Sequence, residues 1–217
     1  MPTSLDTRRQ LLPRILLGAS CAATGGGLLL FFLTGIPLWA GLGAVAGLAV
    51  GAWVVLWPRL AVPSRILILR RCRIGLIAGV PSIIAYDVSR YVLVRATGSS
   101  VKPFGAWPMF GELLGAGPHT GVPAFVVGAG YHVLNGLGFA MAFAVVLGER
   151  GVLAGIIWAM VLETAMVTFY PGWLGLAALQ EFVSITILGH VAYGTVLGWL
   201  SRRLSRQDPQ AVPQWTA

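Results

Sequence analysis

Six long apolar stretches fill most of this 217-residue chain, and they limit what it can fold into. Hydrophobic residues make up 57% of the chain and charged residues only 10%, a composition that excludes a soluble domain. A helix needs about 20 apolar residues to cross the hydrocarbon, so six spans and their loops use the available length. The sequence therefore predicts an all-α, polytopic membrane helix bundle that lies in the lipid bilayer.

The spans are placed by hydropathy and by the Arg, Pro, Gly and Trp residues that bound each apolar stretch. They cover residues 15–34, 38–57, 74–94, 122–147, 152–171 and 174–200. Residues 1–14 form a basic N-terminal segment, and residues 201–217 form a polar tail. We expect a single transmembrane bundle over residues 15–200.

The basic residues predict the orientation of this bundle. In a six-span arrangement, twelve of the fifteen Lys and Arg residues lie on one side, two on the other and one within a span. Because cytoplasmic loops carry an excess of Lys and Arg, the pattern predicts a multi-pass plasma-membrane protein with both termini cytoplasmic. The same distribution explains the net charge of +8 without a nucleic-acid partner.

Several ionisable residues lie inside the predicted spans. A charge at mid-bilayer costs about 2.5–3.5 kcal/mol, so each of these residues is a candidate for function. With a rise of about 1.5 Å per residue from the basic end of each helix, six polar side chains from four helices reach depths of about 18–27 Å. These residues are Asp87, Arg90, His132, Asn135, Glu163 and His190. The sequence predicts that they form one intramembrane polar layer.

Pairing within this layer follows from helical spacing. Asp87 and Arg90 are three residues apart and share a helix face, so they can form an ion pair. Glu163 has no basic neighbour one turn away. It must therefore be protonated, pair with Arg90 or a histidine of another helix, or bind a cation.

Two histidines of the layer raise the question of a cofactor. His132 and His190 with Glu163 or Asp87 would make an acceptable shell for a first-row metal, and the two imidazoles alone could hold a haem iron. The alternative is that each histidine hydrogen-bonds within the bundle as a packing residue. The chain contains no compact metal motif such as His-Glu-x-x-His.

Residues 101–114 are too apolar for a free loop and too short to cross the bilayer. We interpret them as an interfacial or re-entrant segment over the outer end of the bundle, either a lid or a simple anchor. Glu112 and His119 would then face an outer vestibule. Glu181, at a depth of about 31 Å, is expected near the same surface.

The second predicted span carries Gly43, Gly47 and Gly51 at four-residue spacing. Small residues at this spacing let two membrane helices approach closely. The stripe is therefore a candidate contact with a second copy of the chain or with a membrane-complex partner.

A resemblance rests on short motifs in the second half of the chain. They are Tyr131-His132, Asn135-Gly136, Gly148-Glu149-Arg150, Gly189-His190 and Tyr193-Gly194 with Gly198. This pattern resembles an uncharacterised family of small bacterial inner-membrane proteins over roughly residues 122–200. The resemblance implies a helical bundle in the plasma membrane and implies no activity, and Asp87 and Arg90 fall outside it.

Three functions remain open at this point. The first is binding or transport of a proton or a small polar or cationic solute at the polar layer. The second is a membrane-embedded enzyme that acts on a lipid-soluble substrate, with Glu163 or Asp87 as a general acid or with a metal or haem. The third is a structural subunit of a membrane complex.

Overall fold

The computed structural model describes residues 4–174 and 179–207, with side chains described over 11–169 and 183–207. This part of the chain is helical and contains no strand. Its elements are α1 (Ser4–Ser20), α2 (Ala23–Thr34), α3 (Leu38–Leu56), the 3-10 helix η1 (Trp57–Arg59), α4 (Val62–Thr97), α5 (Ala106–Leu113), α6 (Val122–Leu147), α7 (Val152–Leu174) and α8 (Leu179–Arg206). The predicted all-α class is confirmed.

Four helices in the described residues are long and apolar enough to cross a membrane. They are Leu38–Arg59, Val122–Leu147, Val152–Phe169 and Val183–Arg206, and the bent pair α1–α2 adds a fifth if it counts as one span. The 36-residue helix α4 is not among them. The chain is thus a helical membrane protein with four or five candidate spans, and six spans stay a prediction.

The first predicted span, residues 15–34, is two helices and not one. The chain bends by 68° between α1 and α2 at Cys21 and Ala22. Three consecutive glycines, Gly25 to Gly27, follow the bend, and glycine is a weak helix former that leaves room for a close neighbour. A Cβ added at Gly41 of α3 would lie only 2.9 Å from the Gly27 carbonyl oxygen, so α2 is held tightly against α3.

The last predicted span also differs from the structure. Helix α8 begins at Leu179 and continues to Arg206, six residues into the predicted tail. Ser201 and Ser205 are buried there, so the end of α8 packs against the bundle. By contrast, the predicted span 122–147 coincides with α6.

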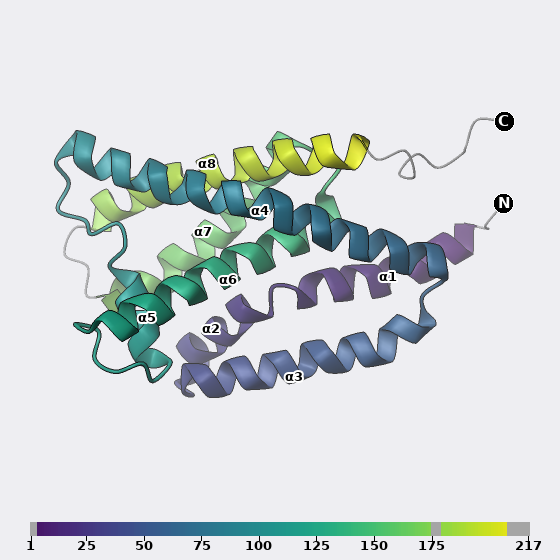
Figure 1. The fold of residues 1–217 in the computed structure, drawn as a ribbon, viewed down its shortest axis with the longest axis horizontal. Coiled ribbons are helices and arrows are strands. Elements are labelled where there is room, and N and C mark those ends of the chain that lie inside the picture. Colours follow the sequence, from purple (N-terminus) through teal and green to yellow (C-terminus); the bar gives the residue numbers. More distant parts are fainter. Residues whose placement is uncertain (1–3, 175–178, 208–217) are drawn as a thin grey trace.

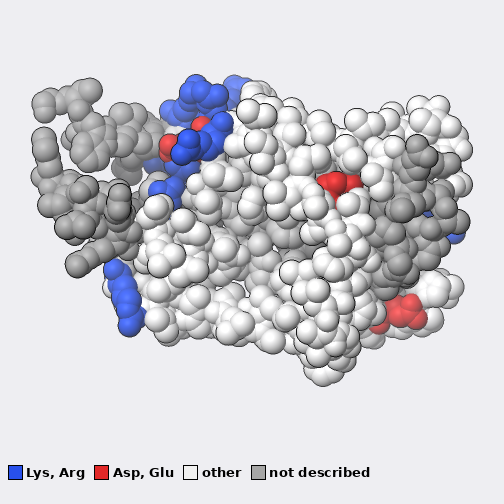
Figure 2. All heavy atoms as spheres, turned by 180° about the vertical axis from the view of Figure 1, so that it is seen from behind, with Lys and Arg blue, Asp and Glu red and all other residues white. Residues whose placement is uncertain are grey.

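Figure 1 shows α4 beside α8, with α6 packed on α4 and the short helix α5 lying against the start of α6. Helix α7 packs mainly on α8, whereas α2 and α3 pair with each other and join the bundle through α1 and α6. Helix α1 begins and helix α8 ends at the same end of the bundle. Figure 2 shows Lys and Arg gathered at that end, while most of the visible face is uncharged.

Helix α5 lies within the predicted interfacial or re-entrant segment. It is held against α6 by two glycines, because a Cβ at Gly111 would lie 1.8 Å from the Ala124 carbonyl oxygen and one at Gly128 would lie 1.6 Å from that of Trp107. The segment is therefore a fixed part of the bundle in this structure.

Glycines also set the crossing of α7 and α8. A Cβ at Gly155 would lie 2.1 Å from the Gly194 carbonyl oxygen, and one at Gly198 would lie 2.4 Å from that of Gly151. In contrast, a Cβ added to any of the three glycines of the α3 stripe would meet no atom within 4 Å. These glycines are Gly43, Gly47 and Gly51. That stripe makes no contact in the described structure and stays available to a partner.

These two glycine environments predict opposite effects of the same substitution. Gly155→Ala forces the backbones of α7 and α8 apart, so we expect it to destabilise the protein by about 1–3 kcal/mol. Gly47→Ala adds a methyl group in open space within a helix, and we expect no loss of stability. Thermal unfolding in detergent micelles measures the stability of both variants. Equal melting temperatures for the two would contradict the close crossing.

Candidate functional site

The structure brings four residues of the predicted polar layer together in two pairs, each of a carboxyl group and an imidazole. Helix α4 supplies Asp87, α6 supplies His132, α7 supplies Glu163 and α8 supplies His190. Each pair joins two helices, so the pairs contribute to the packing of α4 on α6 and of α7 on α8. A buried carboxyl group without a partner would be costly, which explains why each one lies against a histidine.

The first pair fixes the ring of His132. Nε2 of His132 lies 3.2 Å from Oδ2 of Asp87, and both side chains are largely buried. Because a carboxylate only accepts hydrogen bonds, Nε2 carries the ring proton in this pair. No described residue hydrogen-bonds Nδ1 of the neutral ring, which is then an acceptor.

The second pair is more deeply buried and has a third member. Thr186 donates its hydroxyl to Oε1 of Glu163 at 2.7 Å, and Nδ1 of His190 lies 3.0 Å from the Thr186 carbonyl oxygen. The carbonyl accepts, so Nδ1 of His190 carries the proton and Nε2 is left as an acceptor. Oε2 of Glu163 lies 2.7 Å from the same Nδ1 but is not aligned for a hydrogen bond with any described donor.

Tyr86, one residue before Asp87, connects the two pairs. Its ring centroid lies 5.9 Å from that of His132 and 4.8 Å from that of His190, edge-on to the latter. Its hydroxyl points toward the sulfur of Met166 at 4.0 Å. Tyr86 therefore holds the two imidazoles at one level of the bundle.

Arg90 does not form the predicted ion pair with Asp87. Its guanidinium lies over the Tyr86 ring, 4.9 Å from the centroid, and its Nε has no hydrogen-bond partner among the described residues. The side chain of Arg90 packs against Gly189 of the neighbouring helix α8, and its guanidinium lies toward Tyr86, one turn earlier on its own helix. A cation over an aromatic face is attracted by the ring quadrupole, which partly compensates its burial.

Asn135 lies in the same layer but on the side of α2. Thr24 donates its hydroxyl to Oδ1 of Asn135 at 2.7 Å, and Tyr131 donates to the Thr24 carbonyl at 2.9 Å. Tyr193 of α8 donates to the Gly136 carbonyl at 2.8 Å. These bonds connect α2 and α8 to α6 on either side of a pocket.

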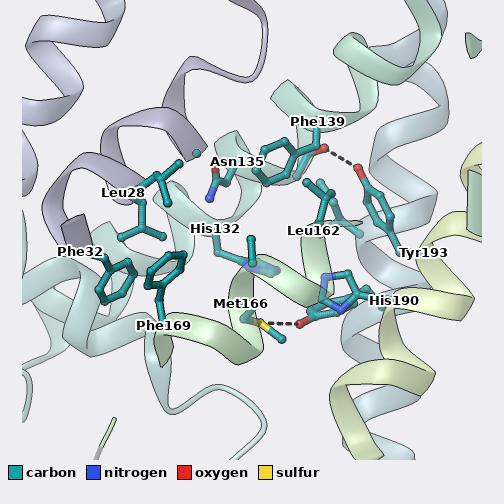
Figure 3. A pocket seen from close by; sticks show the side chains of 16 residues that line it. Leu28, Phe32, His132, Asn135, Phe139, Leu162, Met166, Phe169, His190 and Tyr193 are labelled. Carbon is teal, nitrogen blue, oxygen red and sulfur yellow. Dashed lines mark hydrogen bonds between the residues drawn. The ribbon is translucent and has the colours of Figure 1, made fainter. Parts of the chain in front are cut away.

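This pocket has a volume of about 160 Å³, and Figure 3 shows its side chains. Its polar side is formed by His132, Asn135, His190 and the hydroxyl-bearing Tyr86 and Tyr193. The remaining walls are apolar and come mainly from α2, α6 and α7: Gly25, Leu28, Leu29, Phe32, Ile83, Gly136, Phe139, Leu162, Ala165, Met166 and Phe169. The arrangement presents two imidazoles to a small apolar space.

The residues predicted for an outer vestibule lie apart from this pocket. Glu112 and His119 pair with each other at 2.8 Å on the surface, where about half of each side chain is exposed. Neither residue lines the pocket. The side chain of Glu181 is outside the described residues.

The predicted metal shell of His132, His190 and Glu163 does not form in this arrangement. Among the described residues, no three His, Cys, Asp or Glu side chains lie together in a group that could hold a metal ion. The two histidines are engaged by different carboxyl groups, and both contact Tyr86. The pocket is also smaller than the about 300–1,000 Å³ typical of sites for larger ligands.

Three residues of the site were missed by the sequence reasoning. Tyr86 is not among the residues that the sequence analysis singles out, and Tyr193 enters it only as part of the short motif Tyr193-Gly194. Thr186 lies four residues before His190, and this spacing puts both on one face of α8. This spacing could have indicated that Thr186 lies beside His190 in the site.

Comparison with protein families gives one match. The model of a family of unknown function, DUF6789, matches residues 69–212, about two thirds of the chain. The chain belongs to this family. The match includes Asp87 and Arg90, which the resemblance over residues 122–200 left out, and it supports an uncharacterised family without indicating a bacterial origin or a small size. No curated protein and no solved structure matches the chain.

The burial of Glu163 predicts a large effect on stability. Glu163→Ala removes the acceptor for Thr186 and leaves the N–H of His190 beside a void, so we expect a loss of about 3–5 kcal/mol. Glu112→Ala, which alters an exposed pair, should change stability by about 0.5 kcal/mol or less. Thermal unfolding in the same detergent compares the stabilities of the two variants. A smaller loss for Glu163→Ala than for Glu112→Ala would contradict the described burial.

Proposed function

We propose that this protein binds a small hydrogen-bond-donating solute in the pocket between α2, α6, α7 and α8, and that binding is coupled to proton exchange at His132 and His190. One observation carries the proposal. Two imidazoles, each with one ring nitrogen held by a carboxyl group or a carbonyl, line the same pocket and keep a second nitrogen free of described partners. A free imidazole nitrogen accepts a hydrogen bond or a proton from a ligand.

The charges of the layer support the coupling to protons. Among its described residues, the carboxyl groups of Asp87 and Glu163 are balanced by the guanidinium of Arg90 alone when both histidines are neutral. An uncompensated charge in an apolar bundle is costly, so the layer favours one further positive charge. A proton on either histidine supplies this charge, and so does an ammonium group of a ligand.

The pocket walls support the class of ligand. Phe32, Phe139, Phe169 and Tyr86 are among the lining residues, and aromatic faces accommodate an apolar body as well as an organic cation. Asn135 adds an amide to the polar side. These features favour a small amine or alcohol with an apolar body.

The proposed setting is the plasma membrane, in a six-span arrangement with both termini cytoplasmic. The clustering of Lys and Arg at the end where α1 begins and α8 ends supports this orientation. Under this proposal the histidines lie well inside the hydrocarbon, and transport would require the pocket to release its ligand toward either side.

A second function shares the same geometry. An imidazole oriented by a carboxyl group is the arrangement of a general base, so the pocket also suits proton abstraction from a lipid-soluble substrate. In binding or transport the ligand is released chemically unchanged, whereas an enzyme releases a product. Mass spectrometry of each probe after incubation with the protein separates them.

Binding of simple probes tests the proposal. In phosphatidylcholine nanodiscs, we expect calorimetry to show binding of phenol and benzylamine and weaker binding of toluene, which has no donor. His190→Ala should weaken phenol binding about tenfold, equal to about 1.4 kcal/mol, because it removes a buried acceptor. The binding enthalpy should differ between two buffers of different ionisation enthalpy, because protons are exchanged.

His119→Ala is the matched control, since this histidine is exposed and lies outside the pocket. It should bind both probes as the unchanged protein does. Equal affinity for phenol and toluene, or equal losses in His190→Ala and His119→Ala, would contradict the proposed function.

A further inference from the structure

The pocket has one weakly closed side. Helices α2 and α7 both line it, yet they are not among the helix pairs that pack extensively. Their described ring contact is between Phe32 and Phe169, which stack with centroids 5.7 Å apart and planes 10° from parallel. Figure 3 shows this stacked pair at the edge of the pocket, facing away from His190.

The pocket reaches the outside of the bundle on this same side. Leu29 of α2 is 41% exposed although it lines the pocket, and Ala165 of α7 is also exposed. Both residues are apolar. The mouth of the pocket is thus bordered by side chains that suit hydrocarbon and not water.

The polar groups beside the mouth are satisfied within their own helix. Thr164 donates its hydroxyl to the Met160 carbonyl at 2.8 Å, and Thr168 donates to the Thr164 carbonyl at 2.6 Å. Exposed threonines that bond back to their helix need no water. This face of α7 is therefore compatible with lipid around Ala165.

Among the described residues, the approaches to the pocket along the bundle are packed. Toward the outer end, Trp107 of α5 lies 5.3 Å from the His132 ring, and Phe110 contacts Tyr131 edge-on. Toward the basic end, Phe143, Ala140 and Leu197 are completely buried in the core cluster. Entry from either aqueous side would require these contacts to separate.

We infer that the pocket opens sideways into the bilayer between α2 and α7, with Phe32 and Phe169 as its closure, and that its ligand is a lipophilic molecule of about one aromatic ring with one donor group. The size follows from the volume, because an engineered apolar cavity of about 150 Å³ holds a benzene molecule. The donor group follows from the two histidines. The class of ligand rests on the proposed function of the pocket, whereas the position of the mouth does not.

The mouth is tested without any ligand. A nitroxide is attached at Ala165→Cys in a Cys21→Ser, Cys72→Ser background, and the protein is placed in phosphatidylcholine vesicles. Oxygen concentrates in hydrocarbon and a nickel chelate stays in water, so collisions with oxygen should dominate at Ala165.

Leu48→Cys, on the exposed apolar face of α3, is the lipid control, and Thr120→Cys, in the loop before α6, is the water control. Dominant collisions with the nickel chelate at Ala165 would overturn the inference.

The route is tested with phenol as the probe. Phe32→Cys and Phe169→Cys are introduced in the same background and joined by a short, reducible bis-thiosulfonate. We expect the crosslink to slow phenol association about tenfold and reduction to restore it, since the closure can no longer separate. The same crosslinker applied to the Leu48→Cys variant, which lies outside the pocket, should change nothing.

The outcomes separate this inference from the proposed function. An association rate unchanged by the crosslink would overturn the lateral route while leaving the pocket a binding site. If phenol does not bind the protein with Phe32 and Phe169 in place, the proposed function and the class of ligand fail together. The nitroxide measurement then still confirms or overturns the lateral mouth by itself.

Discussion

The structure depends on how two buried carboxyl groups are partnered in an apolar bundle. Asp87 and Glu163 each lie against a histidine of another helix, and Thr186 adds a hydrogen bond to Glu163. These contacts bring α4 to α6 and α7 to α8 at one level, and Tyr86 contacts both imidazoles. Asp87 contacts Nε2 of His132, and Glu163 and the Thr186 carbonyl contact Nδ1 of His190. The other nitrogen of each ring is therefore left for the pocket. Stability and the proposed chemistry thus have the same origin.

The bundle combines close and loose packing. Glycines bring backbones together where α7 crosses α8 and where α5 lies on α6. Such contacts replace the hydrophobic driving force that lipid does not supply. Between α2, α6 and α7 the larger side chains of Leu28, Phe32 and Phe169 instead leave a space. The small residues therefore fix the polar layer, and the large ones form a pocket beside it that does not fill completely.

Much of this could be predicted from the sequence. Hydropathy predicted the helical class, and helical rise predicted that polar residues of four helices lie near one another, whereas their depth in a bilayer stays a prediction. The pairing could not be predicted, because Asp87 has Arg90 three residues away on its own helix, and only the packing of Gly189 against Arg90 shows why the guanidinium turns to Tyr86. The bend between α1 and α2 was also missed, since no proline interrupts this apolar stretch and the three glycines at 25–27 are the sole signal near the break.

The central claim is that His132 and His190 present free ring nitrogens to a ligand pocket. Nitrogen-15 NMR of histidine-labelled protein in bilayers tests it most directly, with resonances assigned through His→Ala variants of the three histidines. The account predicts a proton on Nδ1 of neutral His190 and on Nε2 of neutral His132, and a shift of the opposite nitrogen of each ring on addition of phenol. His119 should not respond. A shift of His119 alone, or a neutral His190 that carries its proton on Nε2, would contradict the account.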